Sequence, residues 1–363
     1  MKPVIAHIIQ HLKPGGIETL VIEMLKLDSA FDVHVIALEG SKVEAFKKFP
    51  VLENFSKKVH CLNKADGIQW KTAKDLRNKL SEIGADACVS HHIGPLLYTS
   101  MAKIGLKVAH THVEHDAWHL NDPKRERLQS WCLKMSNPTV VADAQVVADI
   151  LIEKFPNIEP YIIHNGIDTA RFVPGSMVEA REKLGLPHGT RLLGCAARLE
   201  PVKRIHRLIN ALTDLPEDIH LVIAGEGSER LPLMQQAKKL NLTNRVHFLG
   251  FITGLETFYQ AIDLFCLVSE HEGFPLSALE AQACGTPVVV SNVGGSKETV
   301  CPKTGLLLLT DDSVQLLNSI KLQLIRSYET SPREFIVSNY SIKSMNEKYE
   351  YLIENMMLFS EVA

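Results

Sequence analysis

Short apolar runs alternate with helix-like segments along nearly all of the 363 residues. The first series of runs lies at 4–9, 33–38, 87–90, 108–111 and 139–142. Between these runs, apolar residues recur at helical spacing. A strand-then-helix alternation of this kind predicts a parallel sheet covered by helices on both faces.

A second series of strand-like runs begins after Asn165 and Gly166. It lies at 192–196, 220–224, 246–249, 264–267 and 287–290. The chain is therefore predicted to be an α/β protein of two Rossmann-like domains, residues 1–165 and 166–340. A semi-apolar helix is expected in the remaining segment, 341–363.

Charge and composition exclude several classes of protein. Lys plus Arg number 39 and Asp plus Glu 42, so the net charge of −3 gives no reason to expect a nucleic-acid partner. No run of about 18 apolar residues is long enough to cross a bilayer. The seven cysteines form no CxxC pair, which favours reduced thiols. Without a signal-peptide pattern at its start, the chain is expected to be cytoplasmic.

The segment from Ser269 to Ser291 is the most informative one. A helix is expected from Pro275 to Cys284, with Glu272 just before it and Glu280 inside it. The N–H groups of a helix start attract anions, and two carboxylates accept hydrogen bonds from hydroxyl groups. The pattern fits a polyol attached to a phosphate. The alternative is a helix-dipole partner at 272 and a solvated residue at 280.

A basic cluster, residues 198–204, lies where a strand ends and a helix begins. Open α/β sheets bind ligands at that edge. Arg198 and Lys203 are predicted to clamp one diphosphate, since a guanidinium and an ammonium together suit that anion. The alternative is a solvated helix face formed by Lys203, Arg204 and Arg207.

Two glycine-containing turns also follow predicted strands. Gly15 and Gly16 allow a ligand to approach the backbone at a helix start, although a tight turn alone needs glycine as well. The segment Gly225–Arg230 imitates a dinucleotide-binding fingerprint, but Arg230 replaces its third glycine. It is therefore weak support for a nicotinamide cofactor.

A histidine-rich stretch supports a different hypothesis. His110, His112 and His115 are spaced almost as in the HxHxDH motif of metal-dependent hydrolases, and imidazoles at that spacing can hold zinc. However, those hydrolases are built on largely antiparallel sheets, whereas this stretch lies inside a parallel series. One histidine that acts as a hydrogen-bond donor or base is the preferred interpretation.

Taken together and in order, the motifs resemble the GT-B-fold retaining glycosyltransferases of family 4, the group 1 glycosyl transferases. The resemblance extends over nearly the whole chain. It rests on the segments PGGIE, IIHNGID, AARLEPVKR, HLVIAGEGSER, VHFLGFI, the E-x7-E of Glu272 and Glu280, and VGGSKE.

The resemblance implies an acceptor-side domain and a nucleotide-sugar domain whose parallel sheets face each other across a cleft, with the last helix returning to the first domain. It implies a catalytic role for His115, with His112 as second choice, and for Arg198, Lys203 and Glu272. The implied donor-binding residues are Gly15, Gly16, Arg198, Lys203, Glu272, Gly273, Phe274 and Glu280. Two positions depart from the family pattern, Arg204 for glycine and Ala144 for serine.

The same resemblance implies a hexosyltransferase that uses no cofactor and no metal ion. The chain has no DxD motif, so the fixed cations and helix N-termini are expected to stabilise the leaving diphosphate. Front-face substitution with retention is the expected mechanism. The rival functions are a nucleotide-sugar epimerase of the same fold, a metal-dependent hydrolase and a non-catalytic sugar-nucleotide binder.

A basic segment suggests where the acceptor comes from. Residues 42–79 contain ten Lys or Arg and four acidic residues, a net charge of +6, with aromatic residues such as Trp70 among them. Each basic residue near an anionic leaflet contributes about 1 kcal/mol. Peripheral contact at the inner face of the membrane is therefore expected, with a saccharide or lipid-linked acceptor of envelope, capsular or exopolysaccharide synthesis. A solvated basic surface is the alternative.

Overall fold

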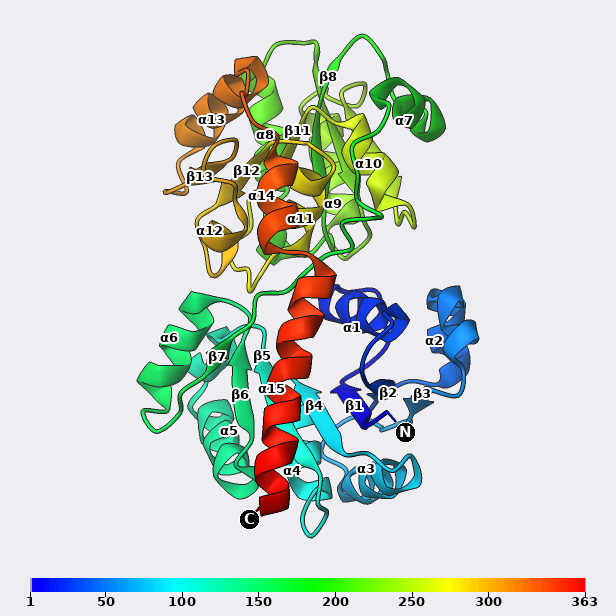
Figure 1. The fold of residues 1–363 in the computed structure, drawn as a ribbon. Helices are drawn as coiled ribbons and strands as arrows, with labels where there is room; N and C mark the ends of the chain where they lie inside the picture. The colour runs from blue at the N-terminus through cyan, green and yellow to red at the C-terminus, as the bar shows by residue number, and fades with distance from the viewer. Residues whose placement is uncertain (1, 363) are drawn as a thin grey trace. The chain divides into compact units, whose positions relative to one another are not determined.

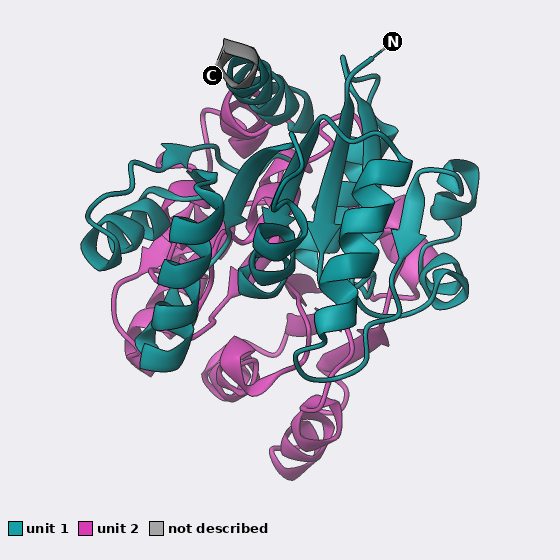
Figure 2. Cartoon of the chain, turned by 90° about the horizontal axis from the view of Figure 1, so that it is seen from below, with its two compact units in different colours: residues 1–166, 342–363 teal, residues 167–341 magenta. Residues whose placement is uncertain are grey.

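The computed structural model describes residues 2–362, including the side chains of residues 2–358. The chain forms two compact units (Figures 1 and 2). Unit 1 comprises Met1–Gly166 and Ile342–Ala363, and unit 2 comprises Ile167–Ser341. Within the described residues, no helix combines the length and the apolar character needed to span a membrane.

Unit 1 is built on a seven-stranded sheet in which every strand pair is parallel. The strand order is β3-β2-β1-β4-β5-β6-β7. The strands are β1 (Val4–Ile9), β2 (Asp32–Ala37), β3 (Val59–Cys61), β4 (Ala87–His91), β5 (Ala109–Glu114), β6 (Thr139–Ala142) and β7 (Tyr161–Ile162).

The helices of unit 1 follow the strands in alternation, except for the last one. They are α1 (Gly16–Lys26), α2 (Lys42–Lys48), α3 (Trp70–Glu82), α4 (Ile93–Ala102), α5 (Pro123–Ser136), α6 (Gln145–Lys154) and α15 (Ile342–Val362). The last helix packs on unit 1, where the Thr111 hydroxyl lies 3.3 Å from the Met356 sulfur and the Ser29 hydroxyl donates to Glu350.

Unit 2 has a six-stranded parallel sheet in the order β10-β9-β8-β11-β12-β13. Its strands are β8 (Arg191–Ala196), β9 (Ile219–Ala224), β10 (Val246–Gly250), β11 (Leu264–Leu267), β12 (Val288–Ser291) and β13 (Leu306–Leu308). Its helices are α7 (Met177–Leu184), α8 (His206–Ala211), α9 (Arg230–Lys239), α10 (Leu255–Ala261), α11 (Leu276–Ala283), α12 (Ser296–Thr299), α13 (Ser313–Ile325) and α14 (Pro332–Asn339).

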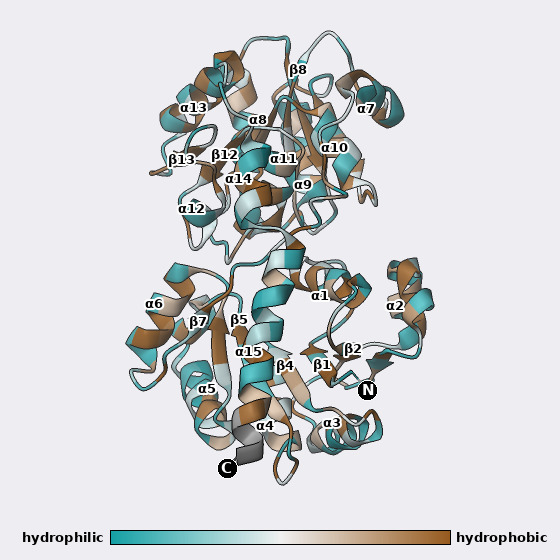
Figure 3. Ribbon diagram, in the orientation of Figure 1, coloured by the Kyte–Doolittle hydropathy of each residue, from teal (hydrophilic) through white to brown (hydrophobic). Residues whose placement is uncertain are grey.

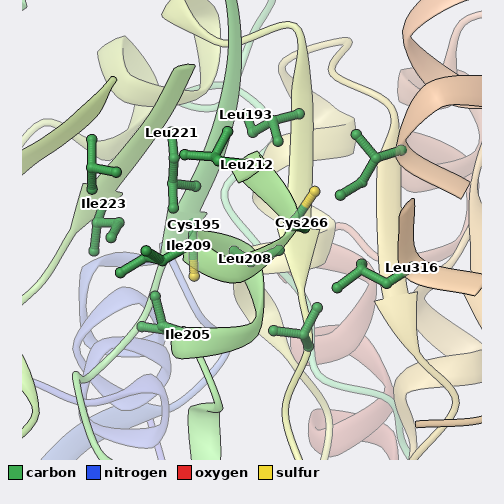
Figure 4. Packing of buried hydrophobic residues seen from close by; sticks show 14 of the residues in the cluster. Leu193, Cys195, Ile205, Leu208, Ile209, Leu212, Leu221, Ile223, Cys266 and Leu316 are labelled. Atoms are coloured by element: carbon green, nitrogen blue, oxygen red, sulfur yellow. The ribbon is translucent and has the colours of Figure 1, made fainter. Parts of the chain in front are cut away.

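The predicted α/β class with two Rossmann-like parallel sheets is confirmed. Strands buried on both faces are nearly continuous apolar runs, whereas the helices alternate between apolar and polar residues (Figure 3). In unit 2 the fully buried Leu193, Leu221 and Ile223 of β8 and β9 pack against Leu208 of α8 and Leu316 of α13 (Figure 4).

The strand orders fix where a ligand can bind. In each sheet the order reverses beside the first strand, between β1 and β4 in unit 1 and between β8 and β11 in unit 2. Loops that leave the carboxyl ends of those two strands run in opposite directions and leave a crevice between them. The segments after β1, β4, β8 and β11 are therefore the expected binding elements of this fold.

Close backbone packing explains the glycines of the turn after β9. A Cβ atom at Gly225 would clash with the carbonyl oxygen of Ala197, and one at Gly227 would clash with that of Leu199. Gly225 also has φ of +136°, a backbone conformation that other residues rarely adopt. These glycines press the turn against the 197–199 loop, so their role is structural.

We expect Gly225→Ala to destabilise unit 2 by about 2 kcal/mol or more, because both the clash and the backbone strain must be relieved. Gly189→Ala is the matched control, since a Cβ atom there meets nothing within 4 Å. Urea unfolding followed by circular dichroism measures both variants. Equal midpoints for the two would show that the turn tolerates a side chain.

Candidate functional site

In unit 2, an ion pair joins the two loops at the strand-order reversal. Lys203 ends a short 3-10 turn after β8, and Glu272 lies in the loop after β11. The Lys203 ammonium donates to Glu272 Oε1 at 2.6 Å, and the Ser269 hydroxyl donates to the same oxygen at 2.5 Å. The side chains are 16% and 9% exposed. The predicted residues Lys203 and Glu272 are thus in direct contact. Ser269 is a hydrogen-bond partner of Glu272 that the sequence did not indicate.

Arg198 leaves β8 on the same side, and its side chain is exposed. Within the described part of the chain its guanidinium forms no ion pair, although its charge contributes to lowering the pKa of Glu200, whose main stabilisation is a hydrogen bond from Ser228. The guanidinium is therefore accessible to an anion a few residues from Lys203.

Arg204 stands where the family pattern has glycine. Its φ of 48° and ψ of 34° are left-handed, a conformation that costs a non-glycine residue energy. The guanidinium is fixed by ion pairs with Glu270 at 2.9 Å and Asp311 at 2.5 Å. The substitution that departed from the family pattern leaves the backbone of the lysine loop intact.

The backbone after Glu272 is held by the glycine loop that precedes α12. The N–H of Gly295 donates to the carbonyl of Gly273 at 2.8 Å. A Cβ atom at Gly294 would clash with the carbonyl oxygen of Glu272. Phe274 is buried, and its ring lies 5.8 Å from that of Tyr340. The Glu272–Phe274 segment is thus rigidly placed.

The helix after this segment begins one residue later than expected, at Leu276, because Pro275 has extended backbone angles and forms the N-cap. Glu280 lies on this helix and is 8% exposed. Its Oε2 accepts a hydrogen bond of 2.7 Å from the Tyr259 hydroxyl. Burial and the neighbouring carboxylate raise the pKa of Tyr259 well above its usual value, so this hydroxyl remains a donor. Tyr259 is a second partner that the sequence did not indicate.

In unit 1, Gly15 and Gly16 form the start of α1 after β1. Gly15 has φ of −170°, which any residue can adopt, so conformation does not explain the glycine. A Cβ atom there would clash with the Glu18 carboxylate, which lies over the turn and pairs with His11 at 3.0 Å. The carboxylate favours this place because it neutralises the positive end of the helix dipole.

The three histidines of the hydrolase hypothesis do not converge. His110 and His112 project from the same face of β5, where both contact the Ser90 hydroxyl, at 2.9 and 3.1 Å. His115 lies on the opposite face, because side chains of a strand alternate. Across residues 2–362, no three His, Cys, Asp or Glu side chains are grouped as a metal site.

His115 belongs to a chain of hydrogen bonds at the carboxyl edge of the unit 1 sheet. Its Nδ1 lies 3.1 Å from Asp143, and its Nε2 lies 2.9 Å from His91, which in turn contacts His7 at 3.0 Å. Asn165 donates to Asp143 at 2.8 Å. His115 is only 4% exposed. The sequence identified His115 but none of its partners.

A second hydrogen-bond network, which includes Glu114 on the other face of the sheet, holds a positive charge on His119. Gln129 donates to Glu114 at 2.6 Å, so its amide oxygen faces His119 Nε2 at 2.8 Å. His119 Nδ1 lies 3.2 Å from Asp116. Both partner atoms are oxygens that can only accept hydrogen bonds. His119 therefore donates from both ring nitrogens and is an imidazolium. Although burial opposes the charge, Asp116, Glu114 and Gln129 raise the pKa of His119 to about 9.

A cavity of about 1450 Å³ also lies in unit 1, at the amino ends of β5 and β6 and beside α15. Residues such as Lys103, Ile162 and Tyr351 line it, and none of the predicted donor-binding residues does. Ligands of open α/β sheets bind at the carboxyl ends of the strands. This cavity is therefore separate from the candidate site.

Family models cover most of the chain. Residues 14–171 match the model described as Glycosyltransferase Family 4, and residues 176–336 match the one described as Glycosyl transferases group 1. The chain is 26% identical over 302 residues, 80% of each protein, to the O-antigen biosynthesis glycosyltransferase WclY of Escherichia coli. It is 40% identical over 141 residues to the D-inositol 3-phosphate glycosyltransferase of Mycolicibacterium gilvum. That match covers 37% of this chain and 32% of the relative.

Solved structures share the fold, which is of the GT-B type. Anabaena Alr3699/HepE in complex with UDP and glucose superimposes with a TM-score of 0.84 at 23% identity, over 97% of this chain and 100% of that one. WaaG, a glycosyltransferase involved in lipopolysaccharide biosynthesis, gives a TM-score of 0.72 at 18% identity, over 96% and 99% of the two chains.

The charge on His119 predicts a pH-dependent stability of unit 1. Because the pKa is raised from 6.5 to about 9, the stabilisation is complete below pH 6.5 and is lost as the pH rises through 9. At pH 6 we expect the free energy of unfolding of the wild-type protein to exceed that of His119→Gln by on the order of 2–3 kcal/mol. This difference should disappear above pH 9. Urea unfolding can be followed by tryptophan emission, since Trp70, Trp118 and Trp131 all lie in unit 1. A difference that stays constant from pH 6 to pH 9.5 would contradict the imidazolium.

Proposed function

Since the chain carries a Family 4 glycosyltransferase domain followed by a group 1 glycosyl transferase domain, we propose that it is a retaining hexosyltransferase. It moves a sugar from a nucleotide diphosphate to a saccharide or lipid-linked saccharide acceptor. The observation that carries this proposal is the ion pair of Lys203 and Glu272 at the strand-order reversal of unit 2, with the exposed Arg198 in the same loop as Lys203. The UDP complex of the similar Anabaena protein supports a uridine nucleotide as the first donor to test.

The donor diphosphate binds to the two cations. An ammonium has three hydrogen-bond donors, so Lys203 can keep its bond to Glu272 and still donate to phosphate oxygens. The Arg198 guanidinium adds a planar pair of donors. The cations thus perform the charge neutralisation that a divalent metal ion supplies in other glycosyltransferases.

The carboxylates have different tasks. Glu280, fixed by the Tyr259 hydroxyl and buried on α11, accepts hydrogen bonds from the ribose hydroxyls of the nucleotide. Glu272 and the N–H groups of Gly273 and Phe274 hold the transferred sugar. Lys203 and Ser269 orient the Glu272 carboxylate for that contact.

The reaction breaks the bond between the anomeric carbon and the diphosphate oxygen. The acceptor hydroxyl forms the new bond to the same face of the sugar, and its proton passes to the departing phosphate oxygen. Negative charge grows on the diphosphate as the bond breaks, so Arg198 and Lys203 bind the transition state more tightly than the donor.

Titration calorimetry with UDP, GDP and ADP tests the clamp. We expect Arg198→Ala and Lys203→Ala each to weaken binding of the preferred nucleotide roughly tenfold or more. The double variant Lys203→Ala/Glu272→Ala is also measured, because Lys203→Ala alone would leave the buried Glu272 carboxylate without its ion-pair partner. Lys183→Ala, which removes an exposed charge on α7, should leave affinity unchanged. Wild-type affinity in Arg198→Ala would contradict the site. Donor consumption without any acceptor would instead favour an epimerase.

We also propose that unit 1 contacts an anionic membrane, where lipid-linked acceptors for envelope polysaccharide are found. The O-antigen relative supports such a pathway. Of the ten cations in residues 42–79, five are engaged locally, for example Lys58 with Asp32 and Lys64 with Glu39. The others form no ion pair within the described residues, and exposed Val43, Ile68 and Trp70 accompany them. These free cations are Lys47, Lys48, Lys57, Lys71 and Lys74.

Vesicle sedimentation tests the membrane contact. Vesicles of phosphatidylglycerol and phosphatidylcholine should bind the protein and shift Trp70 emission to shorter wavelength, whereas pure phosphatidylcholine should not. Lys71→Glu/Lys74→Glu should lower binding by roughly tenfold or more. Lys238→Glu/Lys239→Glu on α9 changes the net charge equally and should bind as the wild type does. An equal loss of vesicle binding in both double variants would show that binding depends only on the net charge of the protein.

A further inference from the structure

The hydrogen-bond chain of unit 1 has a carboxylate at one end, which favours one direction of donation along it. Asp143 Oδ2 accepts from Asn165 and therefore acts as an acceptor toward His115 Nδ1. In the Nδ1–H tautomer, His115 accepts at Nε2 from His91 Nδ1. His91 in turn accepts from His7 Nδ1. Burial lowers the pKa of His7 to about 4 and that of His91 well below 6.5, so these imidazoles are neutral.

The register of the sheet produces this chain. His7 is aligned with Val89 on β4, and His91, two residues further, lies on the same face. In the same way His91 is aligned with Val113 on β5, two residues before His115. The side chains therefore cross four neighbouring strands diagonally toward the carboxyl edge. Both ring nitrogens of His115 are occupied within this chain.

His92 lies next to this chain but is more exposed than its members. It follows β4 directly at the strand-order reversal, and 34% of its side chain is exposed. Its ring lies edge-on to that of His115, with centroids 5.3 Å apart. Within the described residues the nearest charged partner is Asp116, whose Oδ2 is 3.8 Å from Nδ1, beyond hydrogen-bond distance.

The backbone of His92 is strained. Its φ of 67° and ψ of 169° lie in a region that is almost exclusive to glycine, at a cost of about 1–3 kcal/mol. The N–H of His92 donates to Val113 at 3.3 Å, which ties the residue to β5. Such strain persists where the surroundings impose it, and it is concentrated at functional sites.

We propose that His92 is the histidine that hydrogen-bonds a sugar hydroxyl of the substrate, and that His115 is a positioning residue whose ring supports it. This inference rests on the proposed glycosyltransferase function. The groups facing His92 are His115, Asp116, Glu114 and Glu18. Burial and His115 lower the pKa of His92 to about 4, so at neutral pH it offers one donor and one acceptor, as a hydroxyl group requires.

Chemical rescue separates the two histidines. His92→Gly removes the imidazole and relieves the backbone strain, so we expect its unfolding midpoint to equal or exceed that of the wild type. Nucleotide release from UDP-glucose, UDP-galactose, UDP-N-acetylglucosamine and GDP-mannose is then measured in the presence of an added saccharide acceptor, with and without free imidazole. We expect a loss of at least roughly tenfold, a contribution typical of one positioned side chain, and partial recovery with imidazole. His115→Gly should lose activity without recovery, because its site is closed.

The outcomes distinguish this inference from the proposed function. An active wild-type protein with an equally active His92→Gly variant overturns the role of His92 alone, as does rescue of His115→Gly in place of His92→Gly. Release of nucleotide from none of the donors by the wild type contradicts the glycosyltransferase and the role of His92 with it. Comparing the KM for the donor with that for an added saccharide shows which substrate carries the hydroxyl.

Discussion

The proposed donor site of this protein is organised around the ion pair between Lys203 and Glu272. The two residues are 69 positions apart, and the reversal of strand order beside β8 brings their loops together. Removing two charges from water is costly unless each finds a partner. The pair satisfies that requirement, and Ser269 adds a further bond to the carboxylate. The structure can therefore keep a cation and a carboxylate nearly buried at the point where the fold binds ligands.

The same topological rule acts in unit 1, but with a different result. There the reversal places the glycine turn after β1 beside the strained His92 after β4. Instead of a cation and a carboxylate, a row of hydrogen-bonded imidazoles occupies this edge. In the proposed function, unit 2 therefore binds the diphosphate and unit 1 binds hydroxyl groups. This division follows from side chains placed on two sheets of the same type.

Much of the fold was predictable because buried parallel strands are continuous apolar runs, as in β1 and β11. Three strands were missed, namely β3, β7 and β13. They have two or three residues each, which is too short to be distinguished from an apolar loop segment, although β13 consists of three leucines. Their pairing depends on a neighbouring strand that is already in place.

The sequence predicted candidate residues for the site but not the contacts between them. The family motifs identified Lys203, Glu272 and His115, whereas the partners Ser269, Tyr259 and His91 come from the register and loop packing of distant segments. For the role proposed for His92, the only local signal in the sequence was the pair His91 and His92 shortly before Gly94.

The most direct test of the account is a crystal structure of the protein with UDP bound. In that structure, pyrophosphate oxygens should lie within hydrogen-bond distance of both Arg198 and Lys203, while the ribose hydroxyls contact Glu280. A nucleotide bound elsewhere, with the phosphates away from the Lys203–Glu272 pair, would contradict it.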